Sequence, residues 1–456
     1  MPYRLKPRER HFLTAIFLSS FLICVLFIFF TYARFFSGSN DNAIALLGTL
    51  VQSSSALAAI VFAFMIFISQ TVIGKYVSGT LNYIFNYRSF MVTFAFYIFA
   101  TATISLAMWL FSIFYWNAFV DVSFTLFIIE ILLLPFLFFF QSKLLSPKVL
   151  IDTLLSKANL AEEKTRKATI EQIMLVFSTI YKLAENKEYD GATYGLKAVT
   201  NLVTSNPNKE DIGFYLWAVP NYERIGVECF RFDPNISANV ASQLSELVNH
   251  LNKASSFILA NVCSRITSAS FNIASAVAGK PYAENTLVGS YFLLQEIYVS
   301  KSMVDYGFSA YDELFQMAKI IKMMEESNVP THLMTGFSLQ FNCEKLIKAQ
   351  KYEMAESLII GTLNAFPKND YVLQEYVNLI FFAIPLDKKE IADRIIEEMK
   401  TKFGQLEIQF TRTSDPSRSE IGVRDGVISV KAGSDEISEK IGWFKKTKKS
   451  ARMRVP

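Results

Sequence analysis

One uncharged stretch constrains the fold of this chain more than any other feature. Between Asp41 and Lys75 there is no charged residue, and residues 56–68 are entirely apolar. A helix needs about 20 apolar residues to cross the roughly 30 Å of hydrocarbon in a bilayer. The stretch therefore predicts a membrane-spanning helix, and at about 1.5 Å per residue it is longer than one crossing requires.

Three further apolar segments are long enough to cross a membrane. The four predicted spans cover residues 12–30, 43–73, 90–116 and 122–141. The first follows a basic N-terminus, as the apolar core of a signal peptide does. Its apolar run is longer than that of a signal peptide and no small-x-small cleavage site follows it, so we expect a retained anchor.

The distribution of charge predicts both the domain organisation and the orientation. Residues 1–141 hold seven Lys/Arg and four Asp/Glu, whereas residues 142–456 hold 38 and 37. This pattern predicts a membrane-embedded third followed by a water-soluble two-thirds. Basic residues gather before the first span, after the second and after the fourth, and such loops stay in the cytoplasm. We therefore expect an integral protein of a bacterial-type plasma (inner) membrane with both termini cytoplasmic.

A motif covers the end of the second predicted span and the residues after it. Its four characteristic positions are Gln70, Tyr76, Phe85 and Arg88, which align with a known motif without insertions or deletions. In this respect residues 12–151 resemble a large bacterial family of predicted membrane proteins of unknown function, which carry a Pro-Arg pair and then an Asp-Arg pair at this place. Here Ser78-Gly79 replaces the first pair and Tyr87 replaces the aspartate. The resemblance implies four spans and a cytosolic C-terminal part, and it implies no mechanism.

One ionisable residue, Glu130, lies within a predicted span. Counted from the predicted outer interface, Glu130, Gln52 and Ser105 all lie about 14–17 Å deep, with Ser53 and Thr101 close to that level. These five residues form a predicted intramembrane polar layer. A carboxylate within a membrane is costly and commonly marks a transport path. The other interpretation is a protonated Glu130 that is hydrogen-bonded to Gln52 or Ser105 and holds helices together.

The region after residue 145 has helical periodicity almost throughout. Apolar residues recur at spacings of three and four between residues 149 and 399, separated by proline-containing turns. Residues 351–355 followed by Pro367 are similar to the second helix of a tetratricopeptide repeat, although Leu339 and Cys343 stand where that repeat commonly has Trp and Gly. We expect an α-solenoid of helical hairpins, and an irregular helical bundle is the alternative.

The C-terminal residues have a different character. Asp425-Gly426 lies between two alternating apolar runs, which predicts a short β-hairpin. A basic tail follows, with Trp443 and Phe444 before most of its charges. It is either a disordered solubilising tail or a segment that lies on anionic lipid headgroups. The predicted membrane-surface residues of this tail are Lys445, Lys446, Lys448, Lys449, Arg452 and Arg454.

Familiar catalytic and cofactor-binding motifs are absent from the sequence. The three histidines and four cysteines are scattered, and no phosphate-binding loop or nucleophile motif occurs. We therefore predict no enzyme activity, no cofactor and no metal, and a net charge of +4 is too small to indicate nucleic-acid binding.

The predicted fold class is all-α: a four-helix transmembrane bundle, a cytoplasmic α-solenoid-like domain, and a short hairpin with a basic tail. The predicted domains are residues 1–11 (basic N-terminus), 12–145 (membrane), 146–404 (helical) and 405–456 (hairpin and tail). The predicted function is a membrane scaffold or sensor that binds cytoplasmic proteins, with the bilayer and a homo-oligomer as further partners. The alternatives are an oligomeric channel or transporter that uses Glu130, and a membrane-disrupting effector.

Overall fold

The computed structural model describes most of the chain after residue 38. The described residues are 39–76, 88–144, 146–156, 158, 163–205, 211–252, 254–304, 310–330, 337–412, 419–424, 427–432 and 434–446. They fall into two compact units, Met1–Lys157 and Ala158–Pro456.

The first unit consists of long apolar helices. They are α2 (Asn40–Lys75), α4 (Arg88–Phe114) and α5 (Ala118–Leu144), followed by the short α6 (Pro147–Leu155). Within the described residues, three helices are long and apolar enough to cross a membrane, over Asn40–Thr71, Ala95–Phe114 and Ala118–Pro135. These correspond to the second, third and fourth predicted spans. The first predicted span, residues 12–30, lies outside the described residues.

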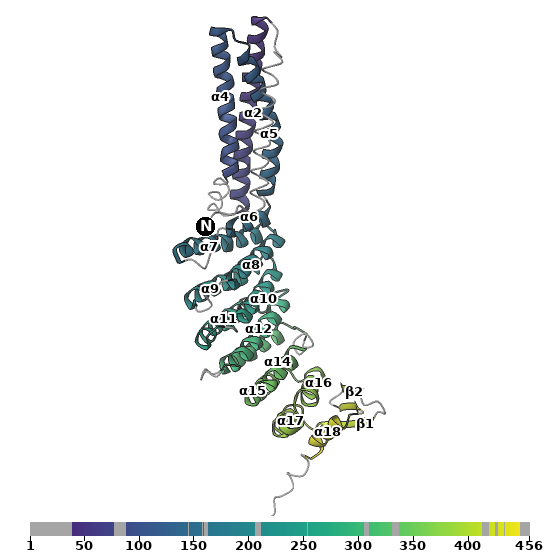
Figure 1. Ribbon diagram of the computed structural model, residues 1–456. Coiled ribbons are helices and arrows are strands. Elements are labelled where there is room, and N and C mark those ends of the chain that lie inside the picture. Colours follow the sequence, from purple (N-terminus) through teal and green to yellow (C-terminus); the bar gives the residue numbers. More distant parts are fainter. Residues whose placement is uncertain are drawn as a thin grey trace, which may run out of the picture. The chain divides into compact units, whose positions relative to one another are not determined.

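The three long helices pack against one another along their lengths (Figure 1). On α2 the buried residues follow spacings of three, four and seven, which places them on one side of the helix. Ala43, Leu47 and Phe111 belong to one buried apolar cluster, and Val61 and Tyr97 form another. Helix α5 continues through Pro135, which lies in its interior.

The second unit is helical over most of its length. Its helices are α7 (Glu163–Glu185), α8 (Tyr189–Thr204), α9 (Ile212–Cys229), α10 (Pro234–Leu251), α11 (Ser256–Val277), α12 (Glu284–Ser302), α13 (Tyr311–Glu326), α14 (Phe337–Lys348), α15 (Tyr352–Ala365), α16 (Asp370–Asn378) and α17 (Lys389–Phe403). A π-helical turn, η2 (Leu379–Ala383), extends α16, and a 3-10 turn, η3 (Leu386–Lys388), leads into α17.

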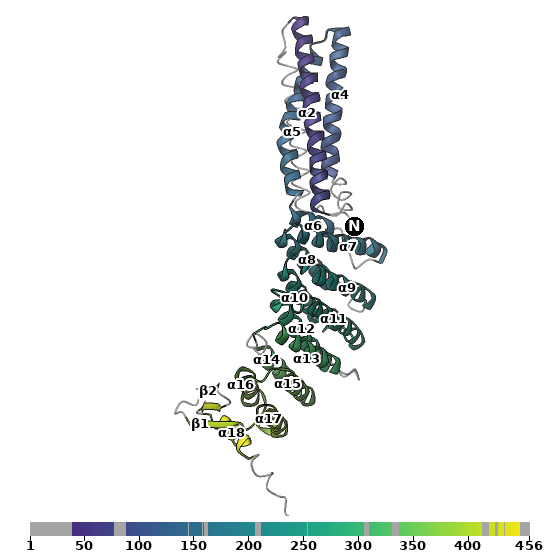
Figure 2. The ribbon, with the colours of Figure 1, turned by 180° about the vertical axis from the view of Figure 1, so that it is seen from behind.

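These helices form two layers. Each odd-numbered helix from α7 to α13 packs against the next odd-numbered helix, and each even-numbered helix from α8 to α12 packs against the next even-numbered one. Figure 2 shows α10, α12 and α14 on one side of the unit and α9, α11 and α13 on the other. Small residues lie at three of the contacts within a layer. A Cβ atom at Gly226, Gly289 or Gly361 would lie within 3.4 Å of Ile273, Ala241 or Leu314, respectively, so these pairs of helices approach closely.

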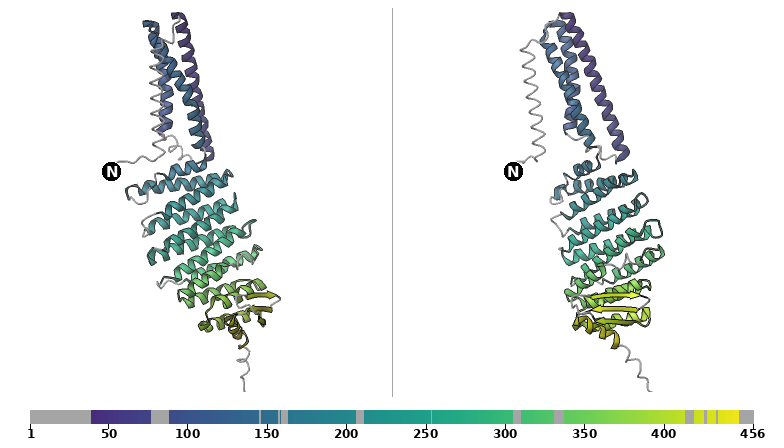
Figure 3. Two further views of the ribbon diagram at one scale, coloured as in Figure 1. Left: turned by 45° about the vertical axis from the view of Figure 1, so that its right-hand side comes forward. Right: turned by 90° about the vertical axis from the view of Figure 1, so that its right-hand side faces the viewer.

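A small sheet and a helix complete the second unit beyond α17. Strands β1 (Glu407–Arg412), β2 (Ser419–Arg424) and β3 (Val427–Ala432) form a sheet in the order β1-β3-β2 (Figure 3). Strands β2 and β3 are antiparallel, with Arg424 opposite Val427, as the Asp-Gly pair predicts. The sequence prediction missed that β1 joins this sheet as the parallel neighbour of β3.

The basic segment after the sheet begins as a helix rather than as a disordered tail. Helix α18 (Asp435–Lys446) packs against α17 and η2. Trp443 and Phe444 are buried, and the Phe444 ring stacks on Phe381 with ring centroids 5.6 Å apart. The aromatic side chains therefore hold this segment on the helical unit, which the charge count alone did not indicate.

Candidate functional site

Glu130 lies on the face of α5 that packs against α2 and α4, and its side chain is fully buried. Its Oε1 atom lies 2.9 Å from the hydroxyl oxygen of Ser54 on α2. The hydroxyl oxygen of Thr101 on α4 lies 2.9 Å from that of Ser54 and 3.4 Å from Oε1 of Glu130. The hydroxyl of Tyr97 on α4 donates a hydrogen bond to the main-chain oxygen of Glu130, at 2.5 Å. One carboxyl group thus connects all three helices.

The number of hydrogens that the hydroxyl groups can donate bears on the protonation state of Glu130. Three contacts of 2.9 Å run in series, from Glu130 to Ser54, from Ser54 to Thr101, and from Thr101 to the main-chain oxygen of Tyr97. Each hydroxyl has one hydrogen to donate, so Ser54 and Thr101 supply only two. Ser54 donates to Oε1 of Glu130 and Thr101 donates to the Tyr97 carbonyl, which leaves the Ser54–Thr101 contact without a hydrogen of its own unless Glu130 is protonated and donates to Ser54 instead.

With an ionised Glu130, one of the three short oxygen–oxygen contacts would have no hydrogen. We therefore predict the neutral form of Glu130. Its second oxygen, Oε2, is buried and has no hydrogen-bond partner in the part of the chain that the structure describes. In the neutral form Oε2 is a carbonyl oxygen, whose burial without a partner costs much less than that of a charged oxygen.

The structure brings together only part of the predicted polar layer. Glu130 and Thr101 are in contact, but Gln52 and Ser105 are exposed on the first unit and Ser53 is half-buried. The Ser105 hydroxyl bonds to the main-chain oxygen of Thr101 in its own helix. Ser54 takes the place predicted for Gln52 or Ser105 as the partner of Glu130. Equal depth did not identify the partner because Gln52 and Ser54 are two residues apart, a rotation of about 200°, and so lie on nearly opposite sides of α2.

Sequence reasoning missed Ser54 and Tyr97 as partners of Glu130. A usable signal existed: Ala43, Leu47, Leu50, Ser54, Val61 and Ile68 repeat at spacings that place Ser54 on the buried stripe of α2. Tyr97 gave no such signal, because a tyrosine among apolar residues is not distinguished from other aromatic residues of a span.

The predicted membrane-surface residues lie mostly beyond the part of the chain that the structure describes. Lys445 and Lys446 are the last two residues of α18. Lys448, Lys449, Arg452 and Arg454 lie outside the described residues. The one basic residue of this segment that the structure places in detail is Lys440. It is buried, and its Nζ atom donates to the Phe381 main-chain oxygen and pairs with Glu436, both at 2.8 Å.

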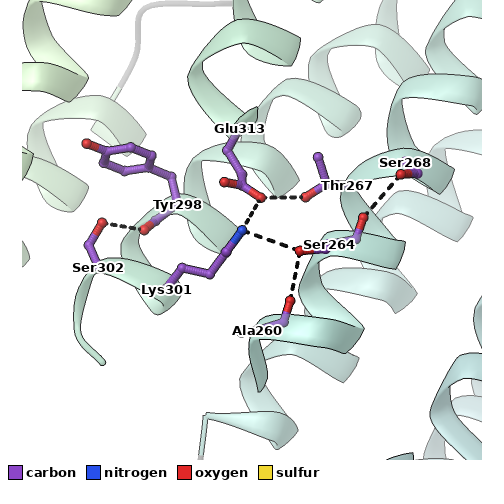
Figure 4. Close-up of polar contacts among 8 residues, drawn as sticks. All are labelled: Ala260, Ser264, Thr267, Ser268, Tyr298, Lys301, Ser302 and Glu313. Carbon is purple, nitrogen blue, oxygen red and sulfur yellow. Dashed lines mark hydrogen bonds and ion pairs between the residues drawn. The ribbon is translucent and has the colours of Figure 1, made fainter. Parts of the chain in front are cut away.

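A second buried polar cluster lies in the helical unit, at the connection between α12 and α13 (Figure 4). Lys301 in the last turn of α12 and Glu313 in the first turn of α13 form an ion pair of 2.8 Å. Their side chains are only 5% and 1% exposed. Thr267 on α11 donates to the same Glu313 oxygen at 3.1 Å. Each charge also lies at the helix end whose dipole favours it, so the pair fixes α12, α13 and α11 together.

Thiol chemistry and metal binding receive no support from the described geometry. Cys229, Cys263 and Cys343 are buried as free thiols, and burial raises the pKa of the Cys229 and Cys263 thiols to about 12. A thiol reacts as the thiolate, so these two are poor nucleophiles at neutral pH. Within the described ranges no three His, Cys, Asp or Glu side chains come together as metal ligands.

Comparison with known proteins assigns no family. The chain matches no family model, no curated protein sequence and no solved structure. The resemblance of its N-terminal third to a bacterial membrane-protein family therefore stays a prediction.

Proposed function

We propose that this protein is an integral membrane scaffold or sensor whose helical unit is an α-solenoid that binds a protein partner in the cytoplasm. The observation that carries the proposal is the combination of spans with a two-layered helical unit in one chain. The helical unit has neither a thiolate site nor a metal-ligand cluster among its described residues. Stacked helical arrays present extended surfaces, and their usual activity is protein binding.

The packing pattern supports an array of repeated helix pairs. In several hydrogen bonds that connect helices of the same layer, the two residues are a similar distance apart in the sequence. The separations are 46 residues for Asn239 and Thr193, 49 for Asn272 and Glu223, and 47 for Asn342 and Gln295. This interval exceeds the ~34 residues of a tetratricopeptide repeat and is close to that of longer helical repeats, ~40–47 residues.

The helical unit also exposes aromatic residues beside cationic ones. Phe315 on α13 is 60% exposed and Phe341 on α14 is 56% exposed. The Nζ atom of Lys319 lies 4.2 Å from the centre of the Phe315 ring, and that of Lys345 lies 4.3 Å from the centre of the Phe341 ring. Exposed aromatic side chains are frequent anchors at protein interfaces. These two positions are therefore the proposed points of partner contact.

Site-specific photo-crosslinking in the full chain tests this proposal. A photoreactive amino acid at position 315 or 341 should give a discrete protein adduct in cells that express the chain. The exposed Glu325 and Lys348, on the same two helices, serve as matched control positions. The same adducts at control and test positions, or no protein adduct at either aromatic position, would refute partner binding there.

One observation favours a second candidate function, transport by an oligomer. Oε2 of Glu130 is a buried acceptor without a partner among the described residues, and such an oxygen is suited to coordinate a migrating cation. The test is flux through liposomes that contain the purified wild-type protein or Glu130→Gln. Equal flux, including none at all, would exclude a transport role for this carboxyl group.

A further inference from the structure

Helix α2 carries a second stripe, on the side that faces away from Ser54. The stripe is made of five small residues and one amide, and all six are exposed. They are Ala45, Thr49, Gln52, Ala56, Ala59 and Ala63. Larger exposed side chains, among them Ile60 and Phe62, lie beside it. The stripe extends over about 27 Å at 1.5 Å per residue, close to the thickness of the hydrocarbon core.

The spacing of this stripe is that of a helix interface. Successive members are four, three, four, three and four residues apart, an average of 3.6 residues, which is the period of the helix itself and keeps all six on one side of α2. Helices in membranes associate mainly through small residues, because small side chains allow the two backbones to approach closely. A face that met only lipid would not require small residues at these six places.

Gln52 indicates what covers the stripe. Several hydroxyl groups exposed on this unit bond to carbonyl groups of their own helix, as Thr49 does to the main-chain oxygen of Ala45 at 2.9 Å. The Gln52 amide has two hydrogens to donate and one oxygen to accept. It has no hydrogen-bond partner in the described part of the chain. Because Gln52 lies about 18 Å along the helix from Asn40, a lipid-facing amide there would be without partners in the hydrocarbon.

We propose that the stripe packs against the same stripe of a second copy of this chain. Every copy inserts in the same orientation, so the two α2 helices would be parallel and in register. Each Gln52 then faces the Gln52 of the other copy, and each amide donates one hydrogen bond and accepts one. An identical amide therefore complements Gln52 in both respects, and a single polar residue in such an interface also fixes its register. The proposal depends on α2 spanning the membrane and not on the partner of the helical unit.

Cysteine crosslinking of the full-length protein in membranes tests the arrangement. The four native cysteines are first replaced by serine, and single cysteines are then introduced as Ala56→Cys, Ala59→Cys or Phe62→Cys. Phe62 is 54% exposed and lies outside the stripe, so it is the matched control. A short thiol-specific crosslinker should give a covalent dimer at positions 56 and 59 and little at position 62. The same yield at all three positions, or no dimer, would overturn the proposal.

The predicted first span is the competing occupant of this stripe. In a separate variant, Gln52→Cys is combined with Ser20→Cys. A crosslink within one chain between these positions would show that residues 12–30 cover the stripe, and would overturn the proposal. Exclusive crosslinking between two copies at position 52 would support it.

The role of the amide has its own test. Energy transfer between labelled copies in liposomes, measured as lipid is added, reports the dimer affinity. Gln52→Leu should weaken the dimer about three- to thirtyfold, the range that corresponds to hydrogen bonds between helices in membranes. Gln52→Asn should retain most of the affinity. An unchanged or stronger dimer with Gln52→Leu would refute the amide pair.

Discussion

The neutral hydrogen-bond chain of Glu130 leads to a quantitative prediction for three variants. Glu130→Gln keeps a donor for Ser54, since its amide replaces the carboxyl O–H, and should change the free energy of unfolding by less than about 0.5 kcal/mol. Glu130→Leu removes one bond between helices and should cost about 0.6–2 kcal/mol. Ser54→Ala removes both 2.9 Å contacts of its hydroxyl, to Glu130 and to Thr101, and should cost about 1–3 kcal/mol.

An ionised Glu130 would produce a different order. Ser54→Ala would then leave a buried charge without its nearest donor and cost about 3–5 kcal/mol. Glu130→Gln would remove the charge and stabilise the protein. The measurement is reversible unfolding of the purified protein in mixed micelles, followed by circular dichroism. Ser53→Ala is the matched control, because Ser53 is half-buried and has no hydrogen bond in the described part of α2.

A double-mutant cycle isolates the contact between Ser54 and Thr101. Ser54→Ala and Thr101→Val interrupt the same chain of hydrogen bonds, so their combined effect should be smaller than the sum of the single effects. Two results would refute the assignment: strictly additive effects, or a loss with Glu130→Gln as large as that with Glu130→Leu.

Four other predictions concern the membrane topology and the helical unit. Alkaline phosphatase should be active when it is fused after Asn40 or Asn117 and inactive when it is fused after Asn86 or Ser156. The reverse pattern would refute a cytoplasmic helical unit. Residues 158–446 should fold alone with a helical circular dichroism spectrum, whereas residues 158–404 should melt at lower temperature, because removal of α18 exposes Phe381. Lys301→Met should lower the free energy of unfolding by about 3–5 kcal/mol in chemical denaturation, because the buried Glu313 loses its cation. The double variant Lys301→Met with Glu313→Gln should recover most of that loss. Burial raises the pKa of Glu375, so the folded unit binds more protons than the unfolded chain. Stability should therefore fall as pH rises from the unfolded pKa of 4.5 through the folded pKa. Glu375→Gln should raise the thermal midpoint at pH 7 but not at pH 4.

The sequence by itself determined where the long apolar helices and most helices of the second unit lie. Uncharged runs of about 20 or more residues have one stable conformation in hydrocarbon, because every backbone group must be paired within the segment. The observed α2, α4 and α5 therefore agree closely with the predicted segments. The Asp-Gly pair likewise located the β2–β3 turn, because few residues favour the backbone conformations of a two-residue hairpin loop.

Only the tertiary structure decided which polar side chains meet. Ser54 and Gln52 lie at nearly the same depth, and the rotation of α2 against α4 and α5 directs Ser54 to Glu130 and leaves Gln52 exposed. Lys301 and Lys440 resemble surface lysines in the sequence, yet both are buried against carboxylate or main-chain oxygens. Periodicity describes one helix at a time, whereas these contacts depend on the packing of several helices, and that packing is set by the sum of many apolar contacts.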